Sequence, residues 1–300
     1  AVPLHRMLRP GHQGRALALG AMGHLHCLDA ATGTIHWVKD LNQDYQIVMP
    51  IWGIAAAPLV VGDTVILHIG GKDACIVALD LESGEQRWTA LNDRASYSSP
   101  VMVQQAGKPV VICWTGDSVS GLAPDTGKVH WRHPFPPSRM PIGIATPVVH
   151  GPDVFLTSFY DGSMMLRLDQ KKLAVSQLWR KVGGDERNTI GLHSIISTPI
   201  RLEGHLYGVD SYGELRCLDA ATGARIWEDQ TATPKARWST IHFVQNKDRV
   251  WMFNERGELI IARLSPQGFE EISRAKLIEP TLDQLNRRNG VCWAHPAFAN

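Results

Sequence analysis

The residues best suited to bind a ligand lie in the least repetitive segments of the sequence, each shortly before a predicted strand. Their side chains are aromatic or cationic, so they could stack on a flat group and donate paired hydrogen bonds to it. The candidates are Trp52, Arg94, Tyr97, His193, Arg237, Trp238, Trp293 and His295. If these segments converge, they predict a site for a flat, anionic or hydroxyl-rich ligand, or for a protein. The alternative is that the same side chains only fill and hydrate the space between the segments.

Catalytic and metal-binding motifs are missing from the sequence. It contains no nucleophile elbow, no phosphate loop and no HExxH zinc motif. His24 and His26 share one face of a predicted strand, but no third ligand follows at the spacing of a zinc site. The five cysteines stand singly on apolar segments and are expected to be buried, reduced thiols. We therefore expect no catalytic residue and no metal ligand.

Charge and hydropathy argue against two further classes of function. The net charge is +1 with both signs scattered along the chain, which gives no field to hold a nucleic acid. The longest uncharged run, 45–62, contains Pro50, Gly53 and Pro58 and falls short of the roughly 20 apolar residues of a membrane-spanning helix. The chain starts with Ala-Val-Pro and shows no signal-peptide pattern, so we expect a processed protein or a fragment.

A repeated hairpin must position the candidate segments. Residues 27–33 and 217–223 have the same sequence, and Trp37 and Trp227 complete the two copies. The Asp of this motif can accept hydrogen bonds from amides just ahead of it, Thr does so more weakly, and Gly adopts a positive φ without a clash. These properties predict a tight turn between two strands.

Further copies of the hairpin are less complete. They end at Trp88, Trp131, Trp179 and Ile272. The third copy has Ala123 in place of Asp, and the fourth has two extra residues and no Thr-Gly after Asp169. The copies end 43 to 51 residues apart, which is the period of a repeat architecture.

The first hairpin follows one predicted strand, and each later hairpin follows two shorter ones, the first of which commonly opens with Pro. Four short antiparallel strands per repeat predict an all-β propeller with about six visible blades, forming one domain over 1–300. The blades are expected at about 15–41, 57–91, 99–134, 146–182, 197–230 and 239–276, with a partial strand at 294–300. This last strand could complete the first blade and close a ring of six, or both ends could be truncated. Only 279–288 has the pattern of a short helix.

The Asp-x-x-Thr-Gly-x-x-x-Trp motif resembles the signature of the pyrroloquinoline-quinone (PQQ) repeat family, over roughly 15–275. That family includes the quinoprotein alcohol dehydrogenases and the BamB-like outer-membrane lipoproteins. The segment Trp293 to Phe298 is also similar to the end of exported PQQ-like propellers. The resemblance implies eight blades, about two of which this chain would lack at its ends, and a periplasmic or extracellular location.

The resemblance also implies structural roles, because the repeat Trp of this family packs against the neighbouring blade. Blade-docking roles are expected for Asp29, Gly33, Trp37, Asp80, Gly84, Trp88, Gly127, Trp131, Trp179, Asp219, Gly223 and Trp227. The quinoprotein dehydrogenases use an adjacent Cys-Cys disulfide and a calcium ion held by Glu, Asn and Asp. This chain has no Cys-Cys, and Asp44, Asp93, Asp185, Glu186 and Asp283 lie toward the middles of their loops. No bound PQQ or calcium is therefore expected.

The function expected from these observations is a non-catalytic scaffold of the cell envelope that binds a protein or a small molecule at the mouth of the propeller. Two alternatives remain open. One is a PQQ-dependent oxidoreductase of alcohols or sugars. The other is a sensor propeller belonging to a larger kinase or membrane-anchored protein.

Overall fold

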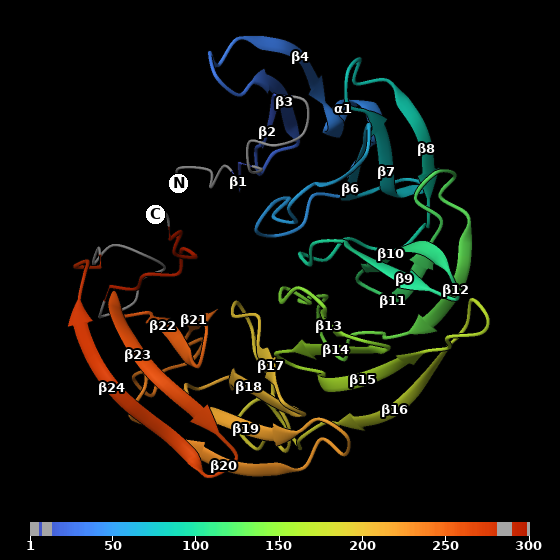
Figure 1. Cartoon of the computed structure of the whole chain (residues 1–300). Coiled ribbons are helices and arrows are strands. Elements are labelled where there is room, and N and C mark those ends of the chain that lie inside the picture. The colour runs from blue at the N-terminus through green and yellow to red at the C-terminus, as the bar shows by residue number, and fades with distance from the viewer. Residues whose placement is uncertain (1–5, 8–13, 281–289, 299–300) are drawn as a thin grey trace. The chain divides into compact units, whose positions relative to one another are not determined.

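The computed structural model describes residues 6–7, 14–280 and 290–298, and these form an all-β protein. Its strands make six antiparallel four-stranded sheets in which strands consecutive in the chain are neighbours (Figure 1). The predicted all-β class and four-stranded blades are confirmed. The one helix in the described part of the chain is α1, Leu41–Tyr45, whose N-cap Asp40 accepts hydrogen bonds from the amides of Asn42 and Gln43.

The first three sheets are β1 to β4, β5 to β8 and β9 to β12. Their strands are β1 Arg6–Met7, β2 Arg15–Leu19, β3 His24–Asp29, β4 Ile35–Asp40, β5 Leu59–Val61, β6 Thr64–Gly71, β7 Ala74–Asp80, β8 Gln86–Ala90, β9 Val101–Gln105, β10 Lys108–Trp114, β11 Ser118–Leu122 and β12 Val129–Pro134.

The other three sheets are β13 to β16, β17 to β20 and β21 to β24. Their strands are β13 Val148–His150, β14 Asp153–Ser158, β15 Gly162–Leu168, β16 Val175–Lys181, β17 Ile200–Leu202, β18 His205–Val209, β19 Leu215–Asp219, β20 Arg225–Asp229, β21 Ile241–Asn246, β22 Arg249–Asn254, β23 Glu258–Ser265 and β24 Gly268–Lys276.

The two ends of the chain differ from the expectation. The first sheet takes its fourth strand from Arg6–Met7, not from 294–300, and residues 294–298 form no strand. Pro296 explains part of this, since it has no amide to donate to a ladder. Residues 299–300 lie outside the described residues. So does most of the expected helix at 279–288, and Glu279 and Pro280 are not helical.

The chain divides into two compact units, which we call the N-terminal unit (1–147 and 168–176) and the C-terminal unit (148–167 and 177–300). In the N-terminal unit, one apolar core joins the first and second sheets through residues such as Leu25 and Val77, and another joins the second and third through Ile76 and Val111. In the C-terminal unit, corresponding cores lie on both sides of the fifth sheet. Burial of apolar faces between successive sheets is thus the main force that holds each unit together.

The hairpin turn has the hydrogen bonds that its residue types predict. Asp219 accepts from the amide of Thr222 at 2.7 Å and from its hydroxyl at 2.7 Å, and Gly223 has φ of +70°. Asp29 and Asp80 make the same bonds at the two earlier turns. The amide of Ser83 and the guanidinium of Arg87 lower the pKa of Asp80 to about 2.

Four of the repeat tryptophans reach the turn of the following sheet. The indole N–H donates to a carbonyl of that turn, in the pairs Trp37 to Leu81, Trp88 to Pro124, Trp179 to Ala220 and Trp227 to Ser265, at 2.8 to 3.0 Å. The ring lies on the turn glycine. A Cβ at Gly84, Gly127 or Gly223 would stand 2.5 to 2.8 Å from an atom of the tryptophan ring. Glycine is therefore needed for close approach as well as for its positive φ.

Trp131 reaches its turn through another side chain. Its indole N–H donates to Oε1 of Gln105 at 2.8 Å, and Nε2 of Gln105 donates to the carbonyl of Ala174 at 2.6 Å, in the enlarged turn after Asp169. Gln105, at the end of β9, is 1% exposed. The glutamine thus spans the place where the fourth hairpin has lost its Thr-Gly turn.

Candidate functional site

Loops of the C-terminal unit form a connected group that contains most of the predicted ligand residues. We call it the C-terminal loop cluster, and it consists of segments 183–193, 210–213, 234–239, 254–257 and 292–295. The amide of Trp238 donates to the carbonyl of Ser211 at 2.9 Å, and the Ser211 hydroxyl donates to the carbonyl of Glu186 at 2.6 Å. The amide of Cys292 donates to the carbonyl of Glu255 at 2.7 Å. Loops distant in sequence are therefore fixed to one another.

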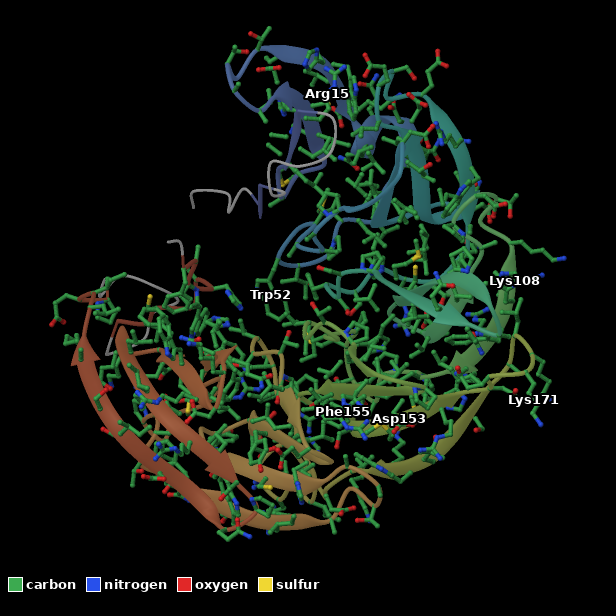
Figure 2. The ribbon with its side chains drawn as sticks, in the orientation of Figure 1. Arg15, Trp52, Lys108, Asp153, Phe155 and Lys171 are labelled. Atoms are coloured by element: carbon green, nitrogen blue, oxygen red, sulfur yellow. The ribbon has the colours of Figure 1, made fainter. Side chains whose placement is uncertain are left out.

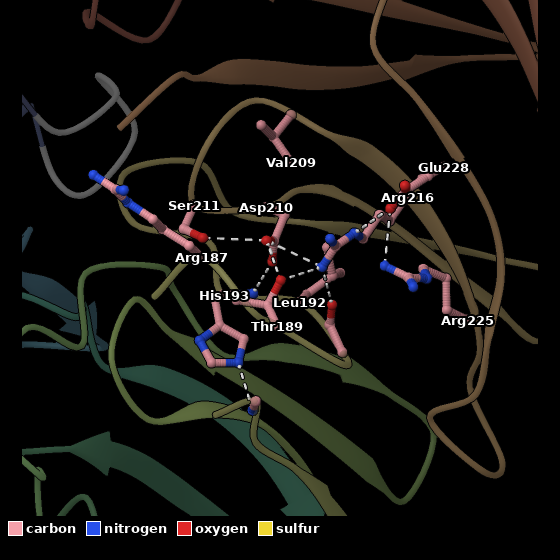
Figure 3. A network of polar contacts seen from close by, with 12 residues as sticks. Arg187, Thr189, Leu192, His193, Val209, Asp210, Ser211, Arg216, Arg225 and Glu228 are labelled. Atoms are coloured by element: carbon pink, nitrogen blue, oxygen red, sulfur yellow. Dashed lines mark hydrogen bonds and ion pairs between the residues drawn. The ribbon is translucent and has the colours of Figure 1, made fainter. Parts of the chain in front are cut away.

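A buried ion pair between Asp210 and Arg216 supports this cluster (Figure 3). Asp210 and Arg216 are 2% and 4% exposed, and their charged atoms lie 3.0 Å apart. Asp210 also accepts from the hydroxyl of Thr189 and the amide of His193, both at 2.6 Å. Arg216 donates to the carbonyl of Gly191 at 2.8 Å. A buried charge needs such partners, and here they fix the path of segment 189–193.

His193 was predicted to face a ligand, and the structure corrects this prediction. Its ring is buried, with Nδ1 lying 2.9 Å from the carbonyl of Phe159 and Nε2 accepting from the amide of Gly183 at 3.3 Å. Burial lowers the pKa of the ring. This pattern corresponds to a neutral imidazole that donates through Nδ1 and holds two loops together. No motif around His193 predicts that both ring nitrogens are hydrogen-bonded.

Arg237 lies at the centre of an aromatic group. Its guanidinium makes two hydrogen bonds to the carboxylate of Glu186, at 2.9 and 3.0 Å, and one to the Tyr160 hydroxyl at 3.2 Å. It also lies over the rings of Phe159 and Trp238, with Cζ 5.1 and 4.6 Å from the ring centroids. The arginine side chain remains 39% exposed. A planar cation is thus held in a fixed orientation at the surface.

Trp238 has an unusual backbone and an unusual side chain. Its φ is +70°, a left-handed conformation that is strained for a bulky residue. Its ring packs edge-on against Phe159 and Trp293, at centroid distances of 6.5 and 6.4 Å. Within the described part of the chain, its buried indole N–H has no hydrogen-bond partner. A strained backbone and a buried N–H without a hydrogen bond, both on one residue, are more typical of a binding site than of packing alone.

Trp293 and His295 lie next to this group. The indole of Trp293 donates to the carboxylate of buried Glu255 at 3.4 Å, and its carbonyl lies 3.0 Å from Nε2 of His242. The rings of His295 and His242 are 4.8 Å apart. His295 is exposed, but it belongs to the edge of the cluster beside the sixth sheet, not to the Arg237 group.

The remaining candidates belong to the N-terminal unit. The ring of Trp52 is 42% exposed and lies 5.5 Å from the ring of Tyr97, which is buried. Burial raises the pKa of Tyr97, whose hydroxyl contacts the backbone of Trp52. Arg94 is held by Asp117 through its side chain and its amide, at 2.5 to 3.0 Å. Trp52 therefore presents an aromatic surface supported by Tyr97, and Asp117 fixes Arg94, whose side chain is 58% exposed.

The loop that carries Trp52 is also the most apolar exposed segment of the N-terminal unit. Val48 and Ile51 are 83% and 72% exposed, and no charged residue occurs between 46 and 57. The loop is fixed by a hydrogen bond from the amide of Ile54 to the carbonyl of Ala21 at 2.8 Å. Ordered apolar surface of this kind is more typical of protein contacts than of catalysis.

The loop carboxylates are engaged in local interactions. Asp93 is buried and pairs with Arg132 and with the hydroxyls of Thr115 and Ser118, while Glu186 pairs with Arg237. Asp185 accepts from amides of its own turn and Asp44 pairs with Lys39. Asp283 lies outside the described residues. Across 6–7, 14–280 and 290–298, no three His, Cys, Asp or Glu side chains are grouped to hold a metal ion.

Several residues of the cluster were not expected from the sequence. Tyr160, Tyr212 and the Asp210–Arg216 pair lie in or beside repeated strands, and they become neighbours of the loops only in the fold. From the sequence, Glu186 was identified only as an acidic residue in the middle of a loop. Its position next to Arg187 and five residues before the Gly-Leu-His segment carries no recognisable motif.

Comparison with known proteins now identifies the family. The model of the family described as outer membrane protein assembly factor BamB matches residues 3–229, most of the chain. The chain belongs to the BamB family. The sequence prediction of a BamB-like PQQ-repeat propeller is therefore confirmed.

Two curated members of the BamB family are similar in sequence. BamB of Yersinia pestis is 22% identical over 285 residues, covering 94% of this chain and 70% of the relative. BamB of Shewanella oneidensis is 22% identical over 218 residues, covering 71% of this chain and 54% of the relative. The chain thus spans between about half and somewhat over two thirds of these proteins.

Solved structures show the same fold. BamB from Moraxella catarrhalis has a TM-score of 0.62 at 20% identity, over 89% of this chain and 75% of its own. A europium-containing methanol dehydrogenase has a TM-score of 0.57 at 13% identity, over 91% of this chain and 68% of its own. At such identities the likeness establishes the propeller fold and says nothing about the activity.

Proposed function

We propose that this chain is a non-catalytic interaction propeller of the cell envelope, which binds partner proteins through loops at the ends of its blades. Membership of the BamB family supports this proposal, because the curated relatives are named as outer membrane protein assembly factors. The observation that carries it is the construction of the C-terminal loop cluster. Arg237 and the half-buried Trp238 present a cationic and aromatic surface, and the carboxylates of Glu186 and Asp210 are engaged in holding the loops.

A periplasmic or extracellular location is part of the same proposal and is supported by the family. No helix in the described ranges is long and apolar enough to cross a membrane. We further propose that the protein works without PQQ or calcium. The support is chemical: the sequence has no Cys-Cys pair, and Asp93 and Glu186 are bound to arginines.

Photo-crosslinking in the native envelope tests the interaction proposal. A photoreactive amino acid at Ile190, which is 54% exposed in the cluster, should give a discrete protein adduct. The same group at Lys171, which projects from a hairpin tip into solvent (Figure 2), should give none. Equal labelling at both positions, or no adduct at Ile190 and at Trp52, would contradict the proposal.

Reconstitution tests the cofactor proposal. The protein is mixed with PQQ and calcium, and quinone absorbance and dye-linked oxidation of alcohols are measured. We expect neither a stoichiometric complex nor turnover. A tight complex that oxidises alcohols would establish the quinoprotein alternative instead.

A further inference from the structure

We propose that the C-terminal loop cluster binds an acidic, extended segment of a partner protein. In this arrangement carboxylates of the segment meet Arg187, Lys235 and Arg256, and an apolar side chain packs beside Arg237 and Trp238. The inference rests on the proposed interaction function and adds the chemistry of the partner.

The exposed charge of the cluster is mainly positive. Arg187, Lys235 and Arg256 are exposed, and none makes an ion pair with another described residue. They come from three different segments, 183–193, 234–239 and 254–257. Of the acids beside them, Glu186 holds Arg237, Glu255 is buried, and exposed Asp185 accepts hydrogen bonds within its own turn. The cluster is therefore complementary to carboxylates, although the whole chain has a net charge of only +1.

The three cations lie on segments that contact one another. The amide of Ala236, next to Lys235, donates to the carbonyl of Tyr212 at 3.1 Å. The ring of Tyr212 lies beneath Arg187, whose Nε donates to its hydroxyl at 3.3 Å. The hydroxyl of Ser239 donates to Glu255, the residue before Arg256, at 3.2 Å. One extended chain could thus meet cations from successive loops.

The cluster also offers an apolar contact between the charges. Trp238 is held in a left-handed conformation beneath Arg237, and segment 183–193 of the same cluster exposes Ile190. Tryptophan and arginine are the residues on which protein-binding surfaces most depend. This mixture suits a peptide that carries both acidic and apolar side chains.

A dense polyanion such as nucleic acid or polyphosphate is a poorer match. Such polymers need an unbroken row of cations. Here the carboxylate of Glu186 lies between Arg187 and Arg237, and it accepts hydrogen bonds from Arg237 and Tyr212. Well-separated cations next to aromatic rings instead favour a polypeptide with spaced carboxylates.

Fluorescence anisotropy with two synthetic peptides tests the inference. One fluorescein-labelled peptide alternates Glu with Leu and Trp, and the other has Gln in place of every Glu. The full chain should bind the Glu peptide at least about tenfold more tightly, since each exposed ion pair is worth about two- to fivefold in affinity. Higher salt should weaken the binding.

A triple variant, Arg187→Gln, Lys235→Gln and Arg256→Gln, should lose about tenfold or more in affinity for the Glu peptide. The matched control carries Lys108→Gln and Lys171→Gln, two solvent-facing lysines of the N-terminal unit (Figure 2), and should bind as the parent does. Circular dichroism checks that both variants are folded. Equal affinity for the two peptides, equal losses in both variants, or binding of polyphosphate or DNA but not the peptide would overturn the inference.

The crosslinking experiment at Ile190 separates this inference from the proposed function. If the adduct persists unchanged in the triple variant, the partner is not held by its acidic residues and only the inference fails. If no protein is crosslinked at Ile190 or Trp52 in the parent, the proposed function itself fails.

Discussion

Gln105 allows the sharpest test of how the degraded repeat is held together. In Gln105→Ala, the buried indole N–H of Trp131 loses its acceptor, and the carbonyl of Ala174 keeps only one of its two donors, the amide of Asp169. The unpaired indole costs about 1–3 kcal/mol, and the vacated volume adds to this. We expect the free energy of unfolding of the N-terminal unit to fall by about 2–4 kcal/mol.

The matched control is Gln104→Ala, one residue earlier on the same strand. Gln104 is exposed and makes no side-chain hydrogen bond with a described residue, so its loss should change stability by less than about 0.5 kcal/mol. Gln105→Met keeps the volume but leaves the indole N–H of Trp131 unpaired, and we expect a loss of about 1–3 kcal/mol for it.

Urea unfolding followed by tryptophan fluorescence measures the overall loss of stability. Native-state hydrogen exchange then locates it, because the amide of Asp169, which donates to the carbonyl of Ala174 at 3.0 Å, should exchange much faster in Gln105→Ala. The reasoning is refuted if Gln105→Ala and Gln104→Ala differ by less than about 1 kcal/mol, or if exchange at residues 169–174 is unchanged.

Three further predictions concern buried groups and turns. Burial lowers the pKa of His68, so the ring is neutral in the folded chain and the unfolded chain binds an extra proton below about pH 6.5. Stability should therefore fall as the pH drops through that value, and His68→Gln should flatten the dependence of the urea midpoint on pH. Asp210→Asn leaves the buried guanidinium of Arg216 with Glu228 as its one carboxylate partner among the described residues, and it should cost about 2–4 kcal/mol by thermal unfolding, most of it recovered when Arg216→Met is added. Gly62→Ala, at a φ of +60° with no atom near the new Cβ, should cost about 1–2 kcal/mol, and Gly84→Ala about 1–3 kcal/mol more in the same measurement, because its Cβ would stand 2.8 Å from a tryptophan ring.

The fold was predictable because the residues that determine the hairpin turn recur in several copies of the repeat. Asp, Thr and Gly determine the turn by bonds within a few residues, as Asp219 shows, and each following Trp meets a partner in the next copy. A single sequence therefore contains several examples of the same turn and the same tryptophan contact. The Gln105 bridge was not predictable, since it joins β9, β12 and a turn more than sixty residues away, as the hydrogen bond to Ala174 shows.

The candidate site was predictable only in part, because residue type does not reveal burial. Arg237 and Trp238 lie together at the surface, as a set of planar and cationic side chains suggested. Tyr97 is buried against the backbone of Trp52, whereas Arg94 stays 58% exposed in its pair with Asp117. These partners are set by the register of distant strands, which the loop sequences do not encode.

Each of the two units contains a buried histidine whose ring hydrogen-bonds to the backbone of a loop. Nδ1 of His68 lies 3.1 Å from the carbonyl of Ser98, and its Nε2 accepts from the amide of Ser96 at 3.3 Å. Both nitrogens of His68 thus tie strand β6 to one loop, whereas those of His193 join two separate segments, at Phe159 and Gly183.

A neutral imidazole offers one donor and one acceptor on opposite sides of a rigid ring, so it can join two backbone segments that share no sequence pattern. The repeated turn fastens the blades, whereas such buried bridges fix the unrepeated loops.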